Sequence, residues 1–389
     1  MDALASSPLG WLCAGVTTLF GVTTLCTAKR SPVGRANMLV WSLLSVLLGL
    51  LCVAMLGAVV GLVVFFAMCL ISVYFGSKVL LPVGDKAVLI TGCDSGIGHA
   101  LAKYLDSLGF VVFAGVLNED GPGAEELQQS CSWRLSVLQL DITNATQVKE
   151  AYLKVSEKVQ NTGLWGVVNN AGILGFPADG ELLPMSAYRQ CMEVNFFGAV
   201  KVSKTFLPLL RKSQGRLVNI SSMAGGIPLP RYAAYSASKA ALSMFSGVMR
   251  QELSKWGIKV AAIHPSGFQT GILGTSDLWD KQEKELMENL PADTRRAYGE
   301  DYLLGLKSFL LDLPVHCAPD LSPVLSSVLH ALLARRPHGL YTPGKGAYLL
   351  LCIFCWSPLW FYDFFISKMM SSVSVPRVPT TSEDESKNL

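Results

Sequence analysis

Four polar residues could together oxidise or reduce an alcohol: Asn195, Ser222, Tyr235 and Lys239. Tyr235 and Lys239 stand four positions apart, so on a helix they share one face and can reach the same site. A tyrosine hydroxyl is a poor base because its ordinary pKa is about 10, but a nearby ammonium favours the phenolate. The spacing therefore predicts a base that removes a hydroxyl proton while a hydride leaves the carbon.

Segment 91–98, with the sequence Thr-Gly-Cys-Asp-Ser-Gly-Ile-Gly, follows a short apolar run and leads into a helical pattern. Glycines let a backbone approach a pyrophosphate, and a helix N-terminus supplies unpaired N–H groups and a partial positive charge. This segment therefore predicts a dinucleotide site. Its expected contacts are Gly92, Ser95, Gly96, Ile97 and Gly98.

These residues need elements that bring them together, and strand-like and helix-like segments alternate from position 86 onward. Six or more parallel strands with helices between them predict an α/β fold with a doubly wound, Rossmann-type sheet. The expected strands are 86–91, 111–116, 135–140, 167–169, 216–220 and 259–263, and the expected helices include 96–108, 186–210 and 233–255.

Further motifs make the chain resemble the short-chain dehydrogenase/reductase family. The glycine spacing is T-G-x-x-x-G-x-G, the run 169–172 reads Asn-Asn-Ala-Gly, and Ser222 stands 13 positions before Tyr235. The resemblance implies that Tyr235 is the general base and that Ser222 orients the substrate oxygen, so both bind substrate. It also implies that Asn195 holds a water that positions Lys239, and that Lys239 bonds the nicotinamide ribose.

The cofactor is expected to be NAD. NAD is usually recognised by an acidic residue after the second strand, whereas the 2′-phosphate of NADP needs Arg or Lys. Asn118 and Glu119 stand there, with no basic residue before Arg134, so either of the two could select NAD. The resemblance implies further cofactor contacts at Asp141, Ile142, Asn170, Ala171, Gly172, Tyr235, Lys239 and Thr270.

The composition indicates a membrane protein. Hydrophobic residues make up 51% and charged residues 16% of the chain, against about 25% charged in ordinary soluble domains. Apolar runs at 9–28 and 36–75 are long enough to cross a bilayer, and a cluster of Lys29, Arg30 and Arg35 lies between them. We predict a membrane anchor at 1–81 with one to three passes, the cluster facing the cytosol.

The rest of the chain divides into three further parts. We expect a catalytic domain at 82–346 with a lid insertion at about 268–319, an apolar segment at 347–370 that lies in the membrane interface, and a disordered tail at 371–389. Ten cysteines without framework spacing indicate free thiols and a reducing compartment. The five histidines lack metal-ligand spacing and the net charge of +3 is diffuse, so neither a metal nor nucleic acid is expected.

Within the family, residues 82–346 resemble the membrane-bound hydroxysteroid dehydrogenases. The resemblance implies NAD-dependent oxidation of the 17β-hydroxyl of steroids at the endoplasmic reticulum membrane, from estradiol to estrone and from testosterone to androstenedione. It also implies contact with membrane lipid, a cytosolic catalytic domain and pairing into a homodimer. Oxidation of retinol or of an 11β-hydroxysteroid, and a non-catalytic lipid-binding module, remain alternatives.

Overall fold

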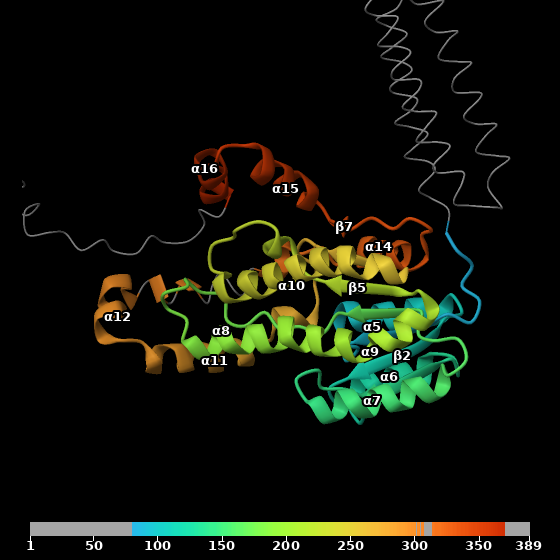
Figure 1. The fold of residues 1–389 in the computed structure, drawn as a ribbon. Helices are drawn as coiled ribbons and strands as arrows, with labels where there is room; N and C mark the ends of the chain where they lie inside the picture. Colours follow the sequence, from blue (N-terminus) through green and yellow to red (C-terminus); the bar gives the residue numbers. More distant parts are fainter. Residues whose placement is uncertain (1–79, 301, 304, 307–312, 370–389) are drawn as a thin grey trace, which may run out of the picture. The chain divides into compact units, whose positions relative to one another are not determined.

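The computed structural model describes residues 80–300, 302–303, 305–306 and 313–369 (Figure 1). The chain splits into two compact units, Met1–Leu80 and Leu81–Leu389. The predicted anchor at 1–81, apart from its last two residues, and the predicted tail at 371–389 lie outside the described residues. Among the helices of the described part, none is both long and apolar enough to cross a membrane.

A parallel sheet of seven strands forms the centre of the second unit, in the order β3-β2-β1-β4-β5-β6-β7. This confirms the predicted α/β class with a Rossmann-type sheet. The order reverses between β1 and β4, and ligands of such sheets bind at the carboxyl edge of this switch point. The strands are β1 Ala87–Thr91, β2 Val111–Val116, β3 Leu135–Gln139, β4 Gly166–Asn169, β5 Arg216–Ile220, β6 Lys259–Ile263 and β7 Leu340–Tyr341.

The helices follow the strands and cover both faces of the sheet. The expected single helix at 186–210 is wrong in one respect: a π turn interrupts it at Glu193–Gly198. The elements are α5 Gly96–Ser107, α6 Pro122–Ser130, α7 Ala145–Lys158, α8 Met185–Met192, η1 Glu193–Gly198, α9 Ala199–Ser213, η2 Met223–Gly225, α10 Ala233–Glu252, η3 Leu253–Trp256, η4 Gly271–Leu273, α11 Ser276–Asn289, α12 Ala292–Tyr298, η5 Leu313–His316, α14 Ser322–Leu333, α15 Ala347–Trp356 and α16 Leu359–Met369.

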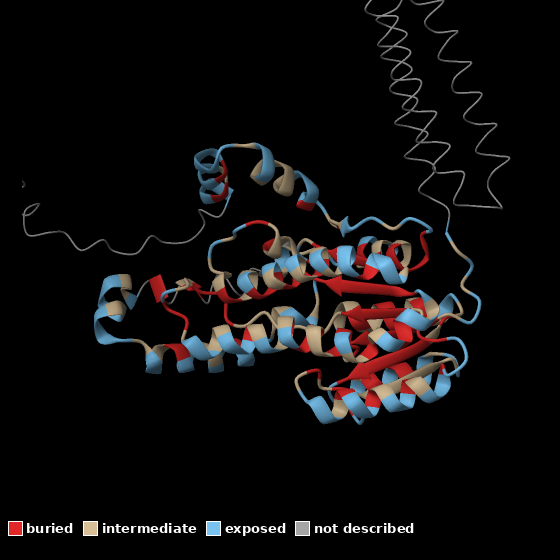
Figure 2. Cartoon of the chain, in the orientation of Figure 1, coloured by how far each residue is buried: buried red, intermediate tan, exposed pale blue. Residues whose placement is uncertain are grey.

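Two apolar layers hold the sheet, one on each face, and Figure 2 shows the central strands as buried. Val88 and Ile90 of β1 pack into the layer that contains α5 and α14, while Leu89 points to the layer of α7 and α9. This division follows from the two-residue period of a strand. Each fully buried side chain of this size contributes roughly 1.5–3 kcal/mol, which fixes the strand register and therefore the positions of the strand ends.

The insertion at 268–319 leaves and rejoins the domain at one point. Gln269 N donates to the Ala318 carbonyl (2.9 Å) and Ala318 N donates to the Gly267 carbonyl (3.0 Å). Between these ends, Trp279 of α11 packs against Phe176 from the segment after β4 with ring centroids 6.0 Å apart. The insertion is therefore an excursion with a closed base that lies over the carboxyl side of β4.

The segment 347–370 forms two helices, α15 and α16, separated by Ser357 and Pro358. Tyr362 and Ile366 pack on Ile227, and Tyr362 Oη donates to the Pro228 carbonyl at 2.7 Å. One side of this helical hairpin is thus seated on the loop that follows β5, and most of its remaining surface is exposed (Figure 2).

Candidate active site

Tyr235 lies in the first turn of α10, next to Ser222, which begins the short helix η2 after β5. Burial raises the pKa of Tyr235 to about 12, while a hydrogen bond with Ser222 acts in the opposite direction. The structure therefore brings the predicted base and the predicted orienting hydroxyl together at the carboxyl end of β5.

Lys239 lies one helical turn further along α10 and is only 2% exposed. Its Nζ donates to the Ile220 carbonyl at 2.9 Å and lies 5.8 Å from the centroid of the Tyr235 ring. Burial lowers the pKa of Lys239 to about 8, so the ammonium persists at neutral pH. A positive charge this close to the Tyr235 ring favours the phenolate form of the tyrosine.

Asn195 is placed by the π turn, with its side chain fully buried. Its Nδ2 donates to the Ile173 carbonyl (2.9 Å) and to Ser238 Oγ (3.0 Å), and its Oδ1 accepts from Ile173 N (2.8 Å). A Cβ at Gly172 would come within 2.9 Å of Asn195 Oδ1 and 3.1 Å of Lys239 Nζ. Asn195 and Lys239 therefore lie on either side of Gly172, and the role of a water between them stays a prediction.

The glycine loop 91–98 has the shape that a pyrophosphate requires. Gly92 and Gly96 adopt positive φ angles of 69° and 60°, and a Cβ at Gly98 would lie 2.1 Å from the Gly92 carbonyl oxygen. Helix α5 begins after Ser95 without a side-chain cap or an acidic residue in its first turn. Its first N–H groups are therefore available to an anion, and the residues present fit a dinucleotide.

Residues from β4 and from the start of the insertion support this loop. Asn170 Nδ2 donates to the carbonyls of Thr91 (2.9 Å) and Gly92 (3.0 Å), and Ala171 N donates to Thr91 Oγ1 (3.0 Å). A Cβ at Gly96 would lie 3.0 Å from Thr270 Cβ. These three predicted cofactor residues thus gather at the loop, and Asn170 uses its amide to hold the loop itself.

Asp141 and Ile142 follow β3 at the same edge of the sheet. The Asp141 carboxylate accepts from Thr143 N (2.8 Å) and Thr143 Oγ1 (2.7 Å). Ile142 is 3% exposed, and a Cβ on Gly198 would lie 2.7 Å from its Cδ1. Both residues shape the turn beside the switch point, and their contact with an adenine stays a prediction.

Sequence reasoning missed Asp94, whose side chain reaches the end of β2. The ribose that carries the 2′-phosphate of NADP is recognised at the end of this strand. The Asp94 carboxylate accepts from Leu117 N (2.9 and 3.1 Å) and Asn118 N (3.3 Å). Asn118 and Glu119, the predicted candidates, are exposed. Asp94 stands in the glycine loop, 23 positions before Leu117, so only the pairing of β1 with β2 brings its charge there.

A small cavity adjoins Tyr235. Its walls come from the segment after β4, from α8 and from the start of α10. Apolar side chains such as Leu174 and Phe176 line it together with the polar Arg231 and Tyr232. The lining residues are Leu174, Gly175, Phe176, Leu183, Ala187, Cys191, Arg231, Tyr232, Ala234 and Tyr235.

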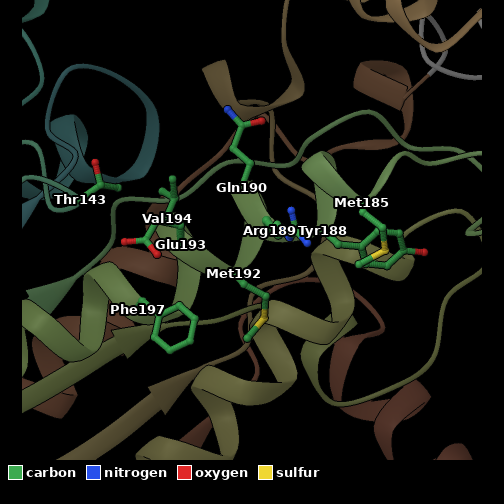
Figure 3. Close-up of a pocket in the computed structure, with 9 residues that line it drawn as sticks. All are labelled: Thr143, Met185, Tyr188, Arg189, Gln190, Met192, Glu193, Val194 and Phe197. Atoms are coloured by element: carbon green, nitrogen blue, oxygen red, sulfur yellow. The ribbon is translucent and has the colours of Figure 1, made fainter. Parts of the chain in front are cut away.

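A second, shallower cavity of about 810 Å³ lies on α8 and η1 and contains none of the four catalytic residues (Figure 3). Its lining combines apolar side chains such as Met185 and Phe197 with the charged Arg189 and Glu193. Met185 is 63% and Phe197 50% exposed. This cavity is a surface feature of the helices that flank the active site.

Residues 86–281 match the family model described as short chain dehydrogenase. The chain belongs to the short-chain dehydrogenase family. It is 55% identical over 365 residues to the 17-beta-hydroxysteroid dehydrogenase type 2 of Homo sapiens, covering 93% of each chain. It is 45% identical over 297 residues to the 11-beta-hydroxysteroid dehydrogenase type 2 of Bos taurus, covering 76% of this chain and 74% of that protein.

Among solved structures, a short-chain dehydrogenase from Streptomyces avermitilis superimposes with a TM-score of 0.58 at 22% identity, over 75% of this chain and 99% of the other. At this identity the likeness concerns the fold alone. Family membership confirms the prediction of an oxidoreductase that uses a nicotinamide cofactor. Family membership and the dehydrogenases among its relatives favour an enzyme over the non-catalytic alternative.

Proposed function

We propose that this protein oxidises the 17β-hydroxyl group of steroids such as estradiol and testosterone to a ketone, with NAD as the hydride acceptor. The observation that carries the reaction is the cluster of Ser222, Tyr235 and the buried Lys239 beside a small cavity. The substrate class rests on the 55% identity to 17-beta-hydroxysteroid dehydrogenase type 2 over 93% of the chain.

The residues divide the work between them. A nicotinamide bound at the carboxyl edge of the sheet supplies the carbon that takes up the hydride. Ser222 holds the substrate hydroxyl, and the Tyr235 phenolate takes its proton. The Lys239 ammonium stabilises that phenolate, and the buried setting strengthens the interaction because water does not screen it.

NAD rather than NADP is supported by the charges at the end of β2. The Asp94 carboxylate is fixed on the main chain of Leu117 and Asn118, and no basic residue occurs between Leu117 and Cys131. A 2′-phosphate placed here would meet a carboxylate without a compensating cation. The hydroxyl groups of an unphosphorylated ribose would instead find an acceptor.

The insertion at 268–319 acts as a lid in this proposal. Tyr302 Oη donates to an Asp179 carboxylate oxygen and Tyr298 Oη to Glu181 Oε2 at 3.1 Å. Both bonds join the insertion to the segment after β4, which also lines the cavity beside Tyr235. Movement of the insertion therefore opens or closes the path of a steroid to the base.

We place the protein at the endoplasmic reticulum membrane, anchored by residues 1–81, with the catalytic domain in the cytosol. The support within the described residues is the hairpin of α15 and α16, where Trp356 is 87% and Trp360 71% exposed. Tryptophan favours the membrane interface, since it has an apolar ring and a polar N–H. Protease added to sealed microsomes should digest the catalytic domain, and full protection would overturn the cytosolic placement.

A homodimer is proposed through α8, η1 and α10. Met244 is 71% exposed on α10, and Phe196 of η1 contacts Phe245 of α10 with ring centroids 6.2 Å apart. Met185 and Phe197, which line the cavity on α8 and η1, add further exposed apolar side chains. Light scattering of the detergent-solubilised protein should give twice the chain mass, and a monomer at micromolar concentration would refute the pairing.

The function is tested by oxidation assays on membranes that carry the wild-type protein or Tyr235→Phe. Estradiol, testosterone, a corticosteroid and retinol are each supplied with NAD or NADP. Estradiol and testosterone with NAD should give the highest kcat/KM. Tyr235→Phe should lose roughly 10²–10⁴-fold in turnover, the range of general base catalysis, while its affinity for NADH stays unchanged. Preferred oxidation of retinol or the corticosteroid would replace the substrate, and undiminished turnover by the variant would refute the base.

A further inference from the structure

A buried histidine that the reaction does not use lies behind the catalytic lysine. His264 follows β6 directly and is 5% exposed. Its Nε2 lies 2.8 Å from Ser243 Oγ, which lies 2.8 Å from Ser221 Oγ. Ser221 Oγ in turn donates to the main-chain carbonyl of Lys239 at 2.8 Å. The chain of contacts therefore runs from β6 to the catalytic turn of α10.

The Lys239 carbonyl accepts from both serines, since Ser243 Oγ also donates to it at 2.8 Å. The carbonyl can only accept, and each serine hydroxyl has one proton to donate. When both serine protons go to the carbonyl, the contact between Ser243 and the ring is a hydrogen bond only if His264 Nε2 carries the proton. Burial together with Lys239 lowers the pKa of His264 to about 4, which keeps the ring neutral.

Two glycines close the space around this chain. A Cβ at Gly225 would lie 2.7 Å from the Lys239 carbonyl carbon and oxygen and 2.8 Å from Ser221 Oγ. A Cβ at Gly226 would lie 3.1 Å from His264 Nδ1. The loop after β5 is thus pressed against both ends of the chain, and the groups it joins have little freedom to shift.

The end of β5 is joined to Lys239 twice. The Ile220 carbonyl accepts from Lys239 Nζ at 2.9 Å, while Ser221 holds the Lys239 main chain, and the next residue is the catalytic Ser222. A displacement of the Lys239 turn would therefore change the position of the ammonium relative to Tyr235.

We propose that His264 is a positioning residue, which acts through Ser243 and Ser221 to hold the Lys239 ammonium beside Tyr235. This proposal rests on the proposed alcohol oxidation. Among the described residues, the titratable groups that face Lys239 are Tyr235 from its own helix, Cys191 from α8 and His264 from β6. Only His264 is joined to Lys239 through the serines.

The test measures kcat/KM against pH for wild type, His264→Phe, His264→Gln and Ser243→Ala. The phenylalanine keeps the ring volume without a donor, and glutamine restores an N–H near the position of Nε2. His264→Phe and Ser243→Ala should lower kcat/KM at pH 7 roughly 3- to 10-fold and move its ascending limb to higher pH by about half a unit or more. His264→Gln should return the limb toward that of wild type.

Ser246→Ala is the matched control, since Ser246 is a buried serine on the same helix that accepts from Asn219 Nδ2 at 2.7 Å. It should lower thermal stability without moving the limb. An unmoved limb in folded His264→Phe and Ser243→Ala, or an equal movement in Ser246→Ala, would overturn the positioning role. If wild type oxidised none of the four alcohols, the proposed function would fail instead, so the two failures are distinguishable.

Discussion

The glycine loop 91–98 and the insertion at 268–319 cover the same carboxyl edge of the sheet, yet they are held in different ways. In the loop, added Cβ atoms would meet backbone at 2.1 Å for Gly98 and 2.7 Å for Gly92. The insertion is held by its closed base, by apolar packing around Trp279 and by two tyrosine hydroxyls. The two regions touch where Thr270 lies against Gly96.

This difference separates the cofactor-binding part of the site, which the family shares, from the part that meets the substrate. Backbone packed against backbone cannot adjust, because any added atom must displace a main chain. The side-chain contacts that hold the insertion can form again in another arrangement at a small cost in free energy. The cofactor end of the site is therefore rigid, and the substrate end is adjustable.

Gly98→Ala tests the rigid side and should have the largest effect. Its Cβ would overlap the Gly92 carbonyl oxygen at 2.1 Å and Asn170 Nδ2 at 2.5 Å, so affinity for NADH should fall at least about 100-fold or the domain should fail to fold. Fluorescence titration and thermal unfolding of the solubilised protein measure these outcomes.

Gly247→Ala is the control, because no atom lies within 4 Å of its added Cβ on α10. Alanine is the better helix former, so stability should rise by about 0.5–1 kcal/mol. Normal NADH affinity in Gly98→Ala would show that the loop is not closely packed.

Asp94→Asn tests the ribose end of the rigid region and should have an intermediate effect. The variant keeps an acceptor for Leu117 N but loses the charge, so preference for NAD over NADP should narrow about 10-fold. Glu119→Gln removes the charge that the sequence favoured and should change the preference less than about twofold, because Glu119 is exposed. The ratio of kcat/KM for the two cofactors decides between them, and the reverse ranking would restore Glu119 as the selecting residue.

Tyr302→Phe tests the adjustable side and should have the smallest effect. It removes one hydrogen bond between the insertion and Asp179, so KM for steroid should rise about 2- to 5-fold with kcat nearly unchanged. Tyr298→Phe should change KM less, since Tyr298 is less buried than Tyr302, which is 5% exposed. A large fall in kcat for Tyr302→Phe would mean that the insertion positions catalytic groups directly.

The central strands could be predicted from the sequence because β1, β4 and β5 are short runs whose residues are all buried. The expected bounds of β2, β5 and β6 agree with the structure, and the motif residues consequently lie where their strands end. The two residues of β7 are too few to give a pattern, and the π turn at Asn195 depends on packing against the chain around Ile173.

Contacts between elements distant in sequence could not be predicted. Asp94 reaches Leu117 only through strand pairing. The contacts from His264 to Ser243 and from Ser243 to Ser221 join residues 21 and 22 positions apart. The apolar segment at 347–370 could be recognised by composition, but its division into two helices depends on Pro358 and on the contact of Tyr362 with Pro228.

The central claim is tested most directly by following the hydride itself. Wild-type membranes are incubated with NAD and estradiol that carries deuterium at C17. Each estrone formed should leave one deuterium on C4 of the nicotinamide, with a matching loss of deuterium from the steroid, and Tyr235→Phe should form both products roughly 10²–10⁴-fold more slowly. No estrone from wild type, or estrone without deuterium on the cofactor, would contradict the proposed oxidation.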